Sequence, residues 1–311
     1  MQNFYTTKYY YFNPFSKQCY FPEGFDKYPL FATFYRPYKI SAKLMWEAWK
    51  TSTLFRSFCS TNEPEKILPL KQIGKYVSPD SIMAFNLGTT GIEQKITILG
   101  VDRTTNDTFF IKYATSEVAC KNVCNEGVIL KQLSHLPFVP ELQSCVKEEN
   151  RFALIKTSVL HGTKMEYLPV NNEILTILRD LSKQDITCTR KYDTGLRSCF
   201  AHGDFCPWNM LTDNGNITLC DWELAGQYPL GYDLFTYIFQ FEFLVKEKMR
   251  FERILYENSD AIKQYFNEFE ITDWHPYLQE FSNLKYLFES EKNNHDLVEP
   301  YLQLKQFANK L

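Results

Sequence analysis

Residues 202–209 have the sequence His-Gly-Asp-Phe-Cys-Pro-Trp-Asn, and residues 218–223 have the sequence Thr-Leu-Cys-Asp-Trp-Glu. Asp204 and Asn209 can point from one loop, which contains Pro207, and Asp221 can approach from the end of a short apolar strand. Phosphoryl transfer needs a carboxylate beside the attacking hydroxyl and oxygen ligands for Mg2+. The pattern is therefore typical of a phosphoryl-transfer site, in which Asp204 and Asn209 point into one cleft and Asp221 can hold a metal from the other side.

A lysine upstream of this pattern supports the same interpretation. Lys112 ends the apolar stretch Phe109–Lys112, where a charged side chain needs a reason. Glu126, on a predicted helix that follows, could pair with it. Taken alone, Lys112 could be an edge-strand lysine that reaches solvent. Lys95 on the preceding strand is an alternative to Lys112 as the pairing lysine. We favour it less because no suitably spaced helix follows it directly.

Glycine is scarce in this chain, with 12 in 311 residues, so its positions are informative. Gly88 and Gly91 fall in a predicted turn between two strands, where the backbone could approach the phosphates of a nucleotide. The glycine-rich pattern G-x-G-x-x-G is absent. A plain hairpin turn is therefore the alternative for these two positions.

The composition argues against several classes of protein. Lys and Arg total 34 and Asp and Glu 37, and the net charge of −3 does not support binding to nucleic acid or to a membrane surface. Nine cysteines without a C-x-x-C pair, and an N-terminus without the apolar core of a signal peptide, predict a cytoplasmic protein with reduced thiols. The most apolar stretch, residues 230–245, is shorter than the ~20 residues a bilayer requires, so we expect a buried helix there and no transmembrane segment.

Three segments are predicted along the chain. Residues 1–80 form an aromatic-rich N-terminal appendage, with a hairpin turning at Asn13-Pro14 and a helix that begins near Ser41 and continues to Phe58. Residues 81–159 form a β-rich lobe with one helix, from Ser116 to about Leu133, and residues 160–311 are mostly helical. The predicted strands are Tyr9–Phe12, Cys19–Phe21, Met83–Leu87, Ile92–Leu99, Thr108–Tyr113, Phe152–Ile155 and Ile217–Cys220. The expected fold class is α+β.

Taken together, these motifs resemble those of the aminoglycoside phosphotransferase and choline kinase-like superfamily, relatives of the protein kinases. The matching positions are His202, Asp204 and Asn209, then Asp221, Trp222 and Glu223, and finally Tyr232, Asp233 and Leu234. The resemblance covers residues 81–240 well, the C-terminal helices loosely and residues 1–80 hardly at all. It implies a protein-kinase-like bilobal fold, with a small β-rich N-lobe and a larger helical C-lobe.

The resemblance also implies cofactors and roles. ATP and Mg2+ are the expected cofactors, with Asp204 orienting the acceptor hydroxyl and Asn209 and Asp221 binding the metal. Lys112, held by Glu126, would contact the α and β phosphates, and adenine would lie against residues 155–160. Asp233 would brace the catalytic loop from a buried helix. Trp208, at a position that is often small in the family, could shape the acceptor pocket or fill the core.

A small hydroxylated acceptor is expected instead of a protein. Only eleven residues, Trp222 to Tyr232, separate Asp221 from Asp233, which leaves little room for an activation loop, and Gly203 stands where protein kinases have arginine. The acidic residues of 242–257 alternate with basic ones, which predicts a solvated helix face and no trap for a cationic acceptor. Similarity to members linked to bacterial surface-glycan synthesis favours a sugar or glycan precursor.

Two other functions remain as alternatives: a catalytically weak nucleotide-binding regulatory protein, and a protein kinase on the same fold. Basic residues along the helix after Ser41 leave open a peripheral membrane contact, or a protein contact, through residues 1–80. We favour a helix that packs on the neighbouring lobe with its basic side chains in solvent.

Overall fold

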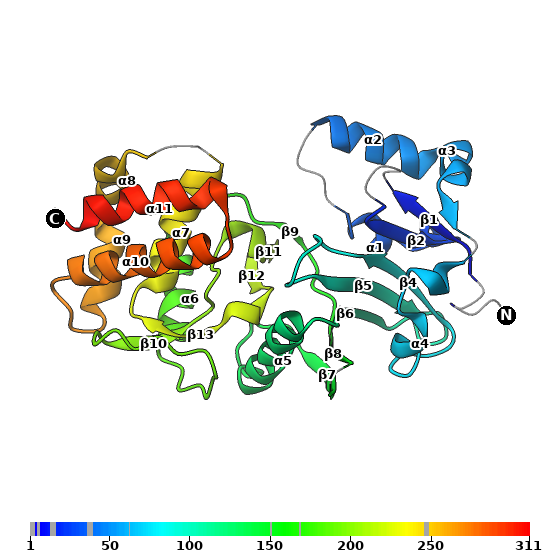
Figure 1. Ribbon diagram of the computed structural model, residues 1–311, viewed down its shortest axis with the longest axis horizontal. Helices are drawn as coiled ribbons and strands as arrows, with labels where there is room; N and C mark the ends of the chain where they lie inside the picture. Colours follow the sequence, from blue (N-terminus) through cyan, green and yellow to red (C-terminus); the bar gives the residue numbers. More distant parts are fainter. Residues whose placement is uncertain are drawn as a thin grey trace. The chain divides into compact units, whose positions relative to one another are not determined.

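The computed structural model describes residues 4, 7–12, 17–35, 40–61, 63–149, 151–167, 169–245 and 249–311. The expected turn at Asn13-Pro14 lies outside these residues. The chain divides into two compact units, which are described separately below (Figure 1). Unit 1 contains residues 1–127 and 141–159, and unit 2 contains residues 128–140 and 160–311.

Unit 1 is built on one sheet of eight strands, in the order β3-β1-β2-β4-β5-β6-β8-β7, and every neighbouring pair is antiparallel. The strands are β1 (Tyr9–Phe12), β2 (Cys19–Pro22), β3 (Ser60–Thr61), β4 (Ser81–Asn86), β5 (Lys95–Asp102), β6 (Thr108–Ala114), β7 (Leu142–Glu148) and β8 (Phe152–Thr157). The hairpin of β1 and β2 is present as predicted, and β2 pairs with β4 through Cys19 opposite Asn86. Residues from the predicted N-terminal appendage therefore extend the sheet of the following segment.

Successive side chains of the central strands point to opposite faces of the sheet and pack into two separate hydrophobic cores. Ile82 and Ala84 pack with Trp46 and Trp49 of α2 (Ile40–Thr51) on one face of the sheet. The residues between and after them, such as Met83 and Phe85, pack on the other face with Leu70 and Ile73 of α4 (Leu70–Ile73). This period of two is the pattern of a strand covered on both sides. The short helix α1 (Pro29–Ala32) follows β2.

The helix expected from Ser41 to Phe58 is interrupted. Ser52 has an extended backbone, with φ −94° and ψ 107°, and its hydroxyl accepts a hydrogen bond from the amide of Phe55. Ser52 is therefore the N-cap of a separate helix, α3 (Thr53–Phe58), which follows α2. The sequence pattern was apolar through both helices, so the capping geometry decides where the first one ends.

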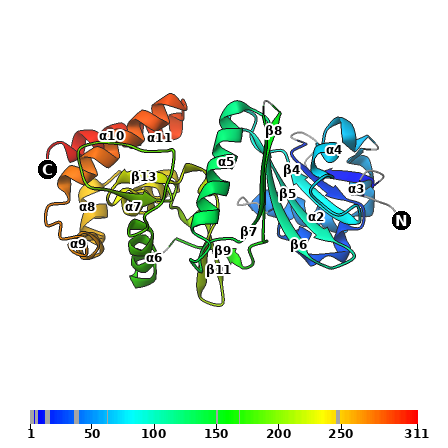
Figure 2. The ribbon, with the colours of Figure 1, turned by 90° about the horizontal axis from the view of Figure 1, so that it is seen from below.

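The helix predicted after Ser116 is confirmed as α5 (Glu117–Gln132). The Ser116 hydroxyl accepts a hydrogen bond from the amide of Ala119 at 3.1 Å, which caps the first turn. Within unit 1, α5 lies along the sheet at β7 and β8 (Figure 2), and Gly127 permits close packing because a Cβ there would lie 2.5 Å from the Cys145 sulfur. Strand β7 itself has no counterpart among the predicted strands.

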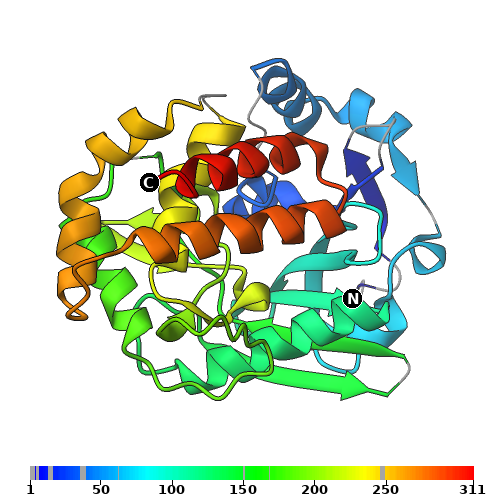
Figure 3. The ribbon, with the colours of Figure 1, turned by 60° about the vertical axis from the view of Figure 1, so that its left-hand side comes forward.

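Unit 2 is mainly helical. Its helices are α6 (Asn172–Ser182), α7 (Tyr232–Leu244), α8 (Phe251–Glu257), α9 (Ser259–Asn267), α10 (His275–Glu291) and α11 (His295–Ala308). Helices α10 and α11 run side by side at the C-terminal end of the chain (Figure 3). The apolar stretch 230–245 forms α7, which is buried over most of its length. No helix among the described residues is long and apolar enough to cross a membrane.

Unit 2 also holds more strands than the sequence predicted. Strand β12 (Asn216–Leu219) was expected, but β9 (Thr163–Lys164), β10 (Ser198–Ala201), β11 (Met210–Asp213) and β13 (Gly226–Pro229) were not. Strand β10 pairs with β13, and β11 lies between β12 and β9. The missed strands are two to four residues long, and β10 and β9 pair with β13 and β11, which lie far from them in the sequence. Both the missed strands and β12 border the loops that carry the candidate site.

Candidate active site

The candidate catalytic loop begins where β10 ends at Ala201. Gly203 has a left-handed backbone with φ +84°, and a Cβ at this position would lie 2.3 Å from the carbonyl oxygen of Leu224. The loop therefore requires glycine both for its conformation and for its close approach to the segment after β12. This explains in physical terms why arginine is absent from the middle position of the His-Gly-Asp triplet.

The side chain of Asp233 on α7 holds the catalytic loop by accepting hydrogen bonds from the loop's backbone amides. The amide of His202 donates a hydrogen bond to Asp233 Oδ2 at 2.6 Å, and the amide of Gly203 donates to Oδ1 at 2.9 Å. Burial raises the pKa of the Asp233 carboxyl to about 7, while the two backbone donors and Lys285 act in the opposite direction. The bracing role expected for Asp233 matches these contacts.

Asp233 should make the free energy of unfolding depend on pH. Its folded pKa of about 7 lies above the ordinary value of 3.8, so the native state retains a proton that the unfolded chain has lost. The stabilisation of the folded state by the protonated Asp233 is full below about pH 4 and is lost as the pH rises through 7. The free energy of unfolding then changes by at most about 1.4 kcal/mol per pH unit.

Urea unfolding of the wild type and of Asp233→Asn between pH 5 and 8 measures this loss of stabilisation. The free energy of unfolding of the wild type relative to that of Asp233→Asn should fall as the pH rises to 7. A difference between the two proteins that does not change with pH would contradict the raised pKa of Asp233.

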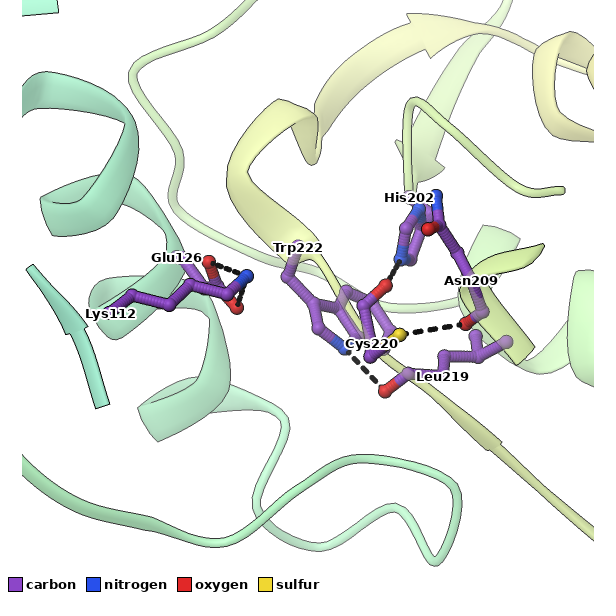
Figure 4. Close-up of polar contacts among 7 residues, drawn as sticks. All are labelled: Lys112, Glu126, His202, Asn209, Leu219, Cys220 and Trp222. Carbon is purple, nitrogen blue, oxygen red and sulfur yellow. Dashed lines mark hydrogen bonds and ion pairs between the residues drawn. The ribbon is translucent and has the colours of Figure 1, made fainter. Parts of the chain in front are cut away.

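His202 ties the catalytic loop to the segment that carries Asp221. Its Nδ1 accepts a hydrogen bond from the amide of Asp204 at 3.3 Å, so its Nε2 carries the hydrogen that is donated to the Cys220 carbonyl at 3.1 Å (Figure 4). The imidazole is fully buried and lies 4.6 Å from the ring of Trp222. The Trp222 indole is itself anchored by a hydrogen bond from its Nε1 to the carbonyl of Leu219. These contacts make His202 and Trp222 structural supports of the site.

The carboxylate of Asp204 accepts hydrogen bonds on both oxygens. Asn209 Nδ2 donates to Oδ2 at 2.8 Å and also to the Asp204 carbonyl at 3.0 Å. Gln240 Nε2 donates to Oδ1 at 3.2 Å, and the Cys206 thiol lies 3.4 Å from the same oxygen. Burial raises the pKa of Cys206 well above its usual value, so this thiol keeps its proton and acts as a weak donor. The orientation of the predicted catalytic carboxylate is thus determined by its neighbours.

Asn209 and Asp221 lie on adjacent segments, as the metal hypothesis requires. Strands β11 and β12 pair with Met210 opposite Leu219, and the Cys220 amide continues the pairing by donating to the Asn209 carbonyl at 2.9 Å. Because the amide nitrogen of Asn209 is bound to Asp204, its Oδ1 is the atom that a cation would take. Asp221 has a left-handed backbone with φ +70° and supplies a carboxylate. An amide oxygen and a carboxylate are hard oxygen ligands, which fit Mg2+.

In unit 1, Lys112 and Glu126 form the ion pair that the sequence predicted. The Lys112 ammonium lies 2.7 Å and 2.6 Å from the two carboxylate oxygens of Glu126 (Figure 4). Lys112 is on β6 and 7% exposed, and Glu126 is on α5 and 2% exposed. Lys95, the alternative lysine, is the first residue of β5 and is only half-buried. The pairing therefore favours Lys112 over Lys95.

Gly88 and Gly91 lie in the connection between β4 and β5 and differ in their constraints. Gly88 has φ +69°, donates its amide to Asn86 Oδ1 at 3.0 Å, and would bring a Cβ within 2.5 Å of the Lys95 carbonyl. A Cβ at Gly91 would meet no atom within 4 Å. The conformation thus requires glycine at position 88 only. The strand after this turn starts at Lys95, three residues later than Ile92, where the sequence placed it.

One acidic residue that was expected to be exposed to solvent is buried. Glu242, expected on a solvated helix face, is 6% exposed near the end of α7. Glu257 and Glu252 on α8 are exposed, and Glu257 forms an ion pair with Arg253 at 2.6 Å, as expected for a solvated helix. Lys246, Glu247 and Lys248 lie outside the described residues. Glu242 lies within the stretch 230–245 that the sequence placed in a buried helix, and it was wrongly grouped with the exposed acidic residues that follow.

The sequence also missed the residues that support Asp204 from the helices of unit 2. Gln240 of α7, Lys285 of α10 and Tyr301 of α11 are all buried and connected by hydrogen bonds. The only available signal was a glutamine within the apolar stretch 230–245, because a buried polar side chain needs partners. Nothing in the sequence indicated that the partners would come from residues 45 and 61 positions later.

Comparisons with known proteins give a partial family match and a similar fold. Residues 165–255, under half of the chain but including both motif loops, match the sequence model of the phosphotransferase enzyme family. A search of curated proteins finds no match.

Among solved structures, the crystal structure of aminoglycoside phosphotransferase APH(4)-Ia is similar, with a TM-score of 0.53 and 11% identity, covering 78% of this chain and 97% of that one. A thermostable mutant of that enzyme, in a ternary complex with AMP-PNP and hygromycin B, has a TM-score of 0.51 and 12% identity, covering 77% and 97%. At these identities the likeness shows the fold, which is α+β and protein-kinase-like with two lobes. The chain thus resembles the aminoglycoside phosphotransferase and choline kinase-like superfamily both in the sequence of residues 165–255 and in its fold.

Proposed function

We propose that this protein transfers the γ-phosphate of ATP, with Mg2+, to a hydroxyl group of a small molecule, with a sugar or glycan precursor as the favoured acceptor. The observation that carries the proposal is the arrangement around Asp204. Its carboxylate is oriented by Asn209 and Gln240, and Asp233 accepts hydrogen bonds from the backbone amides of the two preceding residues, His202 and Gly203. Such an arrangement suits a residue that orients a hydroxyl and accepts its proton.

Each residue of the site has a separate task in this proposal. Asp204 positions the acceptor hydroxyl and accepts its proton, while the hydroxyl oxygen bonds to the γ-phosphorus and the bond to the ADP oxygen breaks. Asn209 and Asp221 would hold Mg2+, which offsets the negative charge of the phosphates when bound. The Lys112 ammonium, paired with Glu126, would contact the α and β phosphates. The backbone of the turn at Gly88 and Gly91 is also a candidate for nucleotide contact.

Two observations support a small acceptor. The segment from Trp222 to Tyr232 is occupied by a single 3-10 turn, Trp222–Leu224, and by β13, so no long activation segment follows the metal-binding residue. The similar structure is a ternary complex with AMP-PNP and hygromycin B, so that protein binds a nucleotide together with a second small molecule. A sugar hydroxyl as acceptor is therefore the first chemistry to test.

The test is a screen of acceptors with the purified protein, ATP and Mg2+. Sugars, amino alcohols and aminoglycosides are compared by acceptor-stimulated ADP release, and the phosphorylated product is identified by 31P NMR. We expect one class to stimulate release, and we expect chelation of Mg2+ by EDTA to abolish it. Tight binding of Mg-ATP without turnover across the panel would favour the regulatory alternative, and phosphate that appears on a protein would favour a protein kinase. GTP in place of ATP in the same assay determines the nucleotide preference.

A further inference from the structure

The carboxylate of Asp204 is supported by a buried side-chain relay that spans three helices. Gln240 of α7 is 7% exposed, and its Nε2 donates to Asp204 Oδ1 at 3.2 Å. Its Oε1 accepts hydrogen bonds from Lys285 Nζ of α10 at 2.8 Å and from the Tyr301 hydroxyl of α11 at 3.3 Å. The relay consists of Gln240, Lys285 and Tyr301, and it ends on Oδ1 of the predicted catalytic carboxylate.

The hydrogen bonds of the relay can run in only one direction from donor to acceptor. An ammonium group donates hydrogen bonds and accepts none, so the atom of Gln240 that faces Lys285 must be the amide oxygen. The NH2 group then necessarily faces Asp204, whose carboxylate oxygens accept hydrogen bonds. Lys285 thereby determines which end of the Gln240 amide meets the carboxylate.

Lys285 is an unusual residue to find in this position. It is 4% exposed, and within the part of the chain that the structure describes no carboxylate forms an ion pair with it. Its ammonium lies 5.3 Å from the ring centroid of Tyr232 and 5.9 Å from that of Tyr301, at cation–π distances. Burying a charge without a direct ion pair is costly, and the positive charge of Lys285 acts through space on the buried carboxyl of Asp233, whose pKa it lowers.

The two donors on Asp204 restrict it in complementary ways. Asn209 binds Oδ2, and rotation of the carboxylate about that single contact would still be allowed. The Gln240 bond to Oδ1 fixes the second oxygen and therefore the plane of the group. The Cys206 thiol adds only a weak donor at 3.4 Å.

We propose that Gln240 is a positioning residue for the transfer reaction: backed by Lys285 and Tyr301, it locks the plane of the Asp204 carboxylate so that the group meets the acceptor hydroxyl correctly. This inference rests on the proposed function. Gln240 acts through Asp204 and does not itself touch the reacting atoms. Loss of this orientation should reduce the rate constant of the chemical step and leave nucleotide binding unchanged, because misplacing a reacting group lowers the rate without weakening remote contacts.

The test compares two substitutions of Gln240 with a matched control. Gln240→Met removes both ends of the amide at similar volume, and Gln240→Glu keeps a partner for Lys285 but replaces the donor to Asp204 with a negative charge. We expect both variants to lower kcat by about 10- to 100-fold, with KM for ATP within about twofold of the wild type. Gln279→Met is the control, because Gln279 Nε2 donates to the Ala308 carbonyl at 3.1 Å between α10 and α11, away from Asp204.

A second readout separates this inference from the proposed function. The 13Cγ resonance of Asp204, assigned in protein labelled at aspartate, should shift in both Gln240 variants and stay unchanged in Gln279→Met. If the wild type transfers no phosphate to any acceptor, the proposed function is wrong, and the resonance still reports whether Gln240 orients Asp204. Wild-type kcat in a folded Gln240→Glu, an equal loss in Gln279→Met, or an unshifted resonance would overturn the inference.

Discussion

Replacing Asp204 by asparagine is expected to reduce acceptor-dependent phosphate transfer by about 10²- to 10⁴-fold, the range attributed to a general base. Asparagine has nearly the shape of aspartate but cannot accept a proton from the hydroxyl. It would also place its NH2 group against one of the two amide nitrogens, of Asn209 or of Gln240, that donate to Asp204 in the wild type. Acceptor-stimulated ADP release, measured at saturating Mg-ATP, determines the loss.

The control for this prediction lies on the adjoining hairpin. Asp213 is exposed at the end of β11, and Asp213→Asn makes the same chemical change outside the site. It should retain wild-type turnover. Because ATP contacts are assigned to other residues, Asp204→Asn should still bind Mg-ATP, which equilibrium titration can measure. Turnover by Asp204→Asn at the wild-type rate would remove Asp204 from its proposed role.

Replacing Lys112 by methionine is expected to affect both stability and nucleotide binding. The change leaves the carboxylate of Glu126, which is 2% exposed, without the ammonium that lies 2.6 Å and 2.7 Å from its oxygens. Breaking a buried ion pair in this way typically costs about 3–5 kcal/mol of the free energy of unfolding. The loss of the positive charge should also weaken Mg-ATP binding. Chemical denaturation and nucleotide titration measure the two effects separately.

The double variant Lys112→Met with Glu126→Met separates the structural effect from the functional one. Replacing both partners of a buried pair by apolar side chains is often close to neutral for stability. The double variant should therefore regain most of the lost stability, while nucleotide binding stays weak. Lys95→Met is the matched control on the neighbouring strand and should change both quantities little. If Lys95→Met weakened ATP binding as much as Lys112→Met, the nucleotide-binding lysine would have been misidentified.

Local sequence was most informative where the chemistry sits on short, contiguous stretches. The hairpin of β1 and β2 and the helix α5 are where the sequence placed them, because alternation and a capping serine are local signals. The ion pair of Lys112 with Glu126 was predictable since a lysine in an apolar strand requires a partner close by in the fold. In unit 2, β9, β10 and β13 were missed, and each of them pairs with a strand that lies far from it in the sequence.

What the sequence by itself determined is the inventory of the site: Asp204, Asn209 and Asp221 at characteristic spacings, with Lys112 and Glu126 upstream. Only the tertiary structure decided how Asp204 is oriented. Gln240, Lys285 and Tyr301 come from three different helices and meet through packing, and their spacing along the chain carries no signal of contact. The physical reason is that a side-chain hydrogen bond depends on distances of about 3 Å between atoms, which only the folded arrangement of the helices determines.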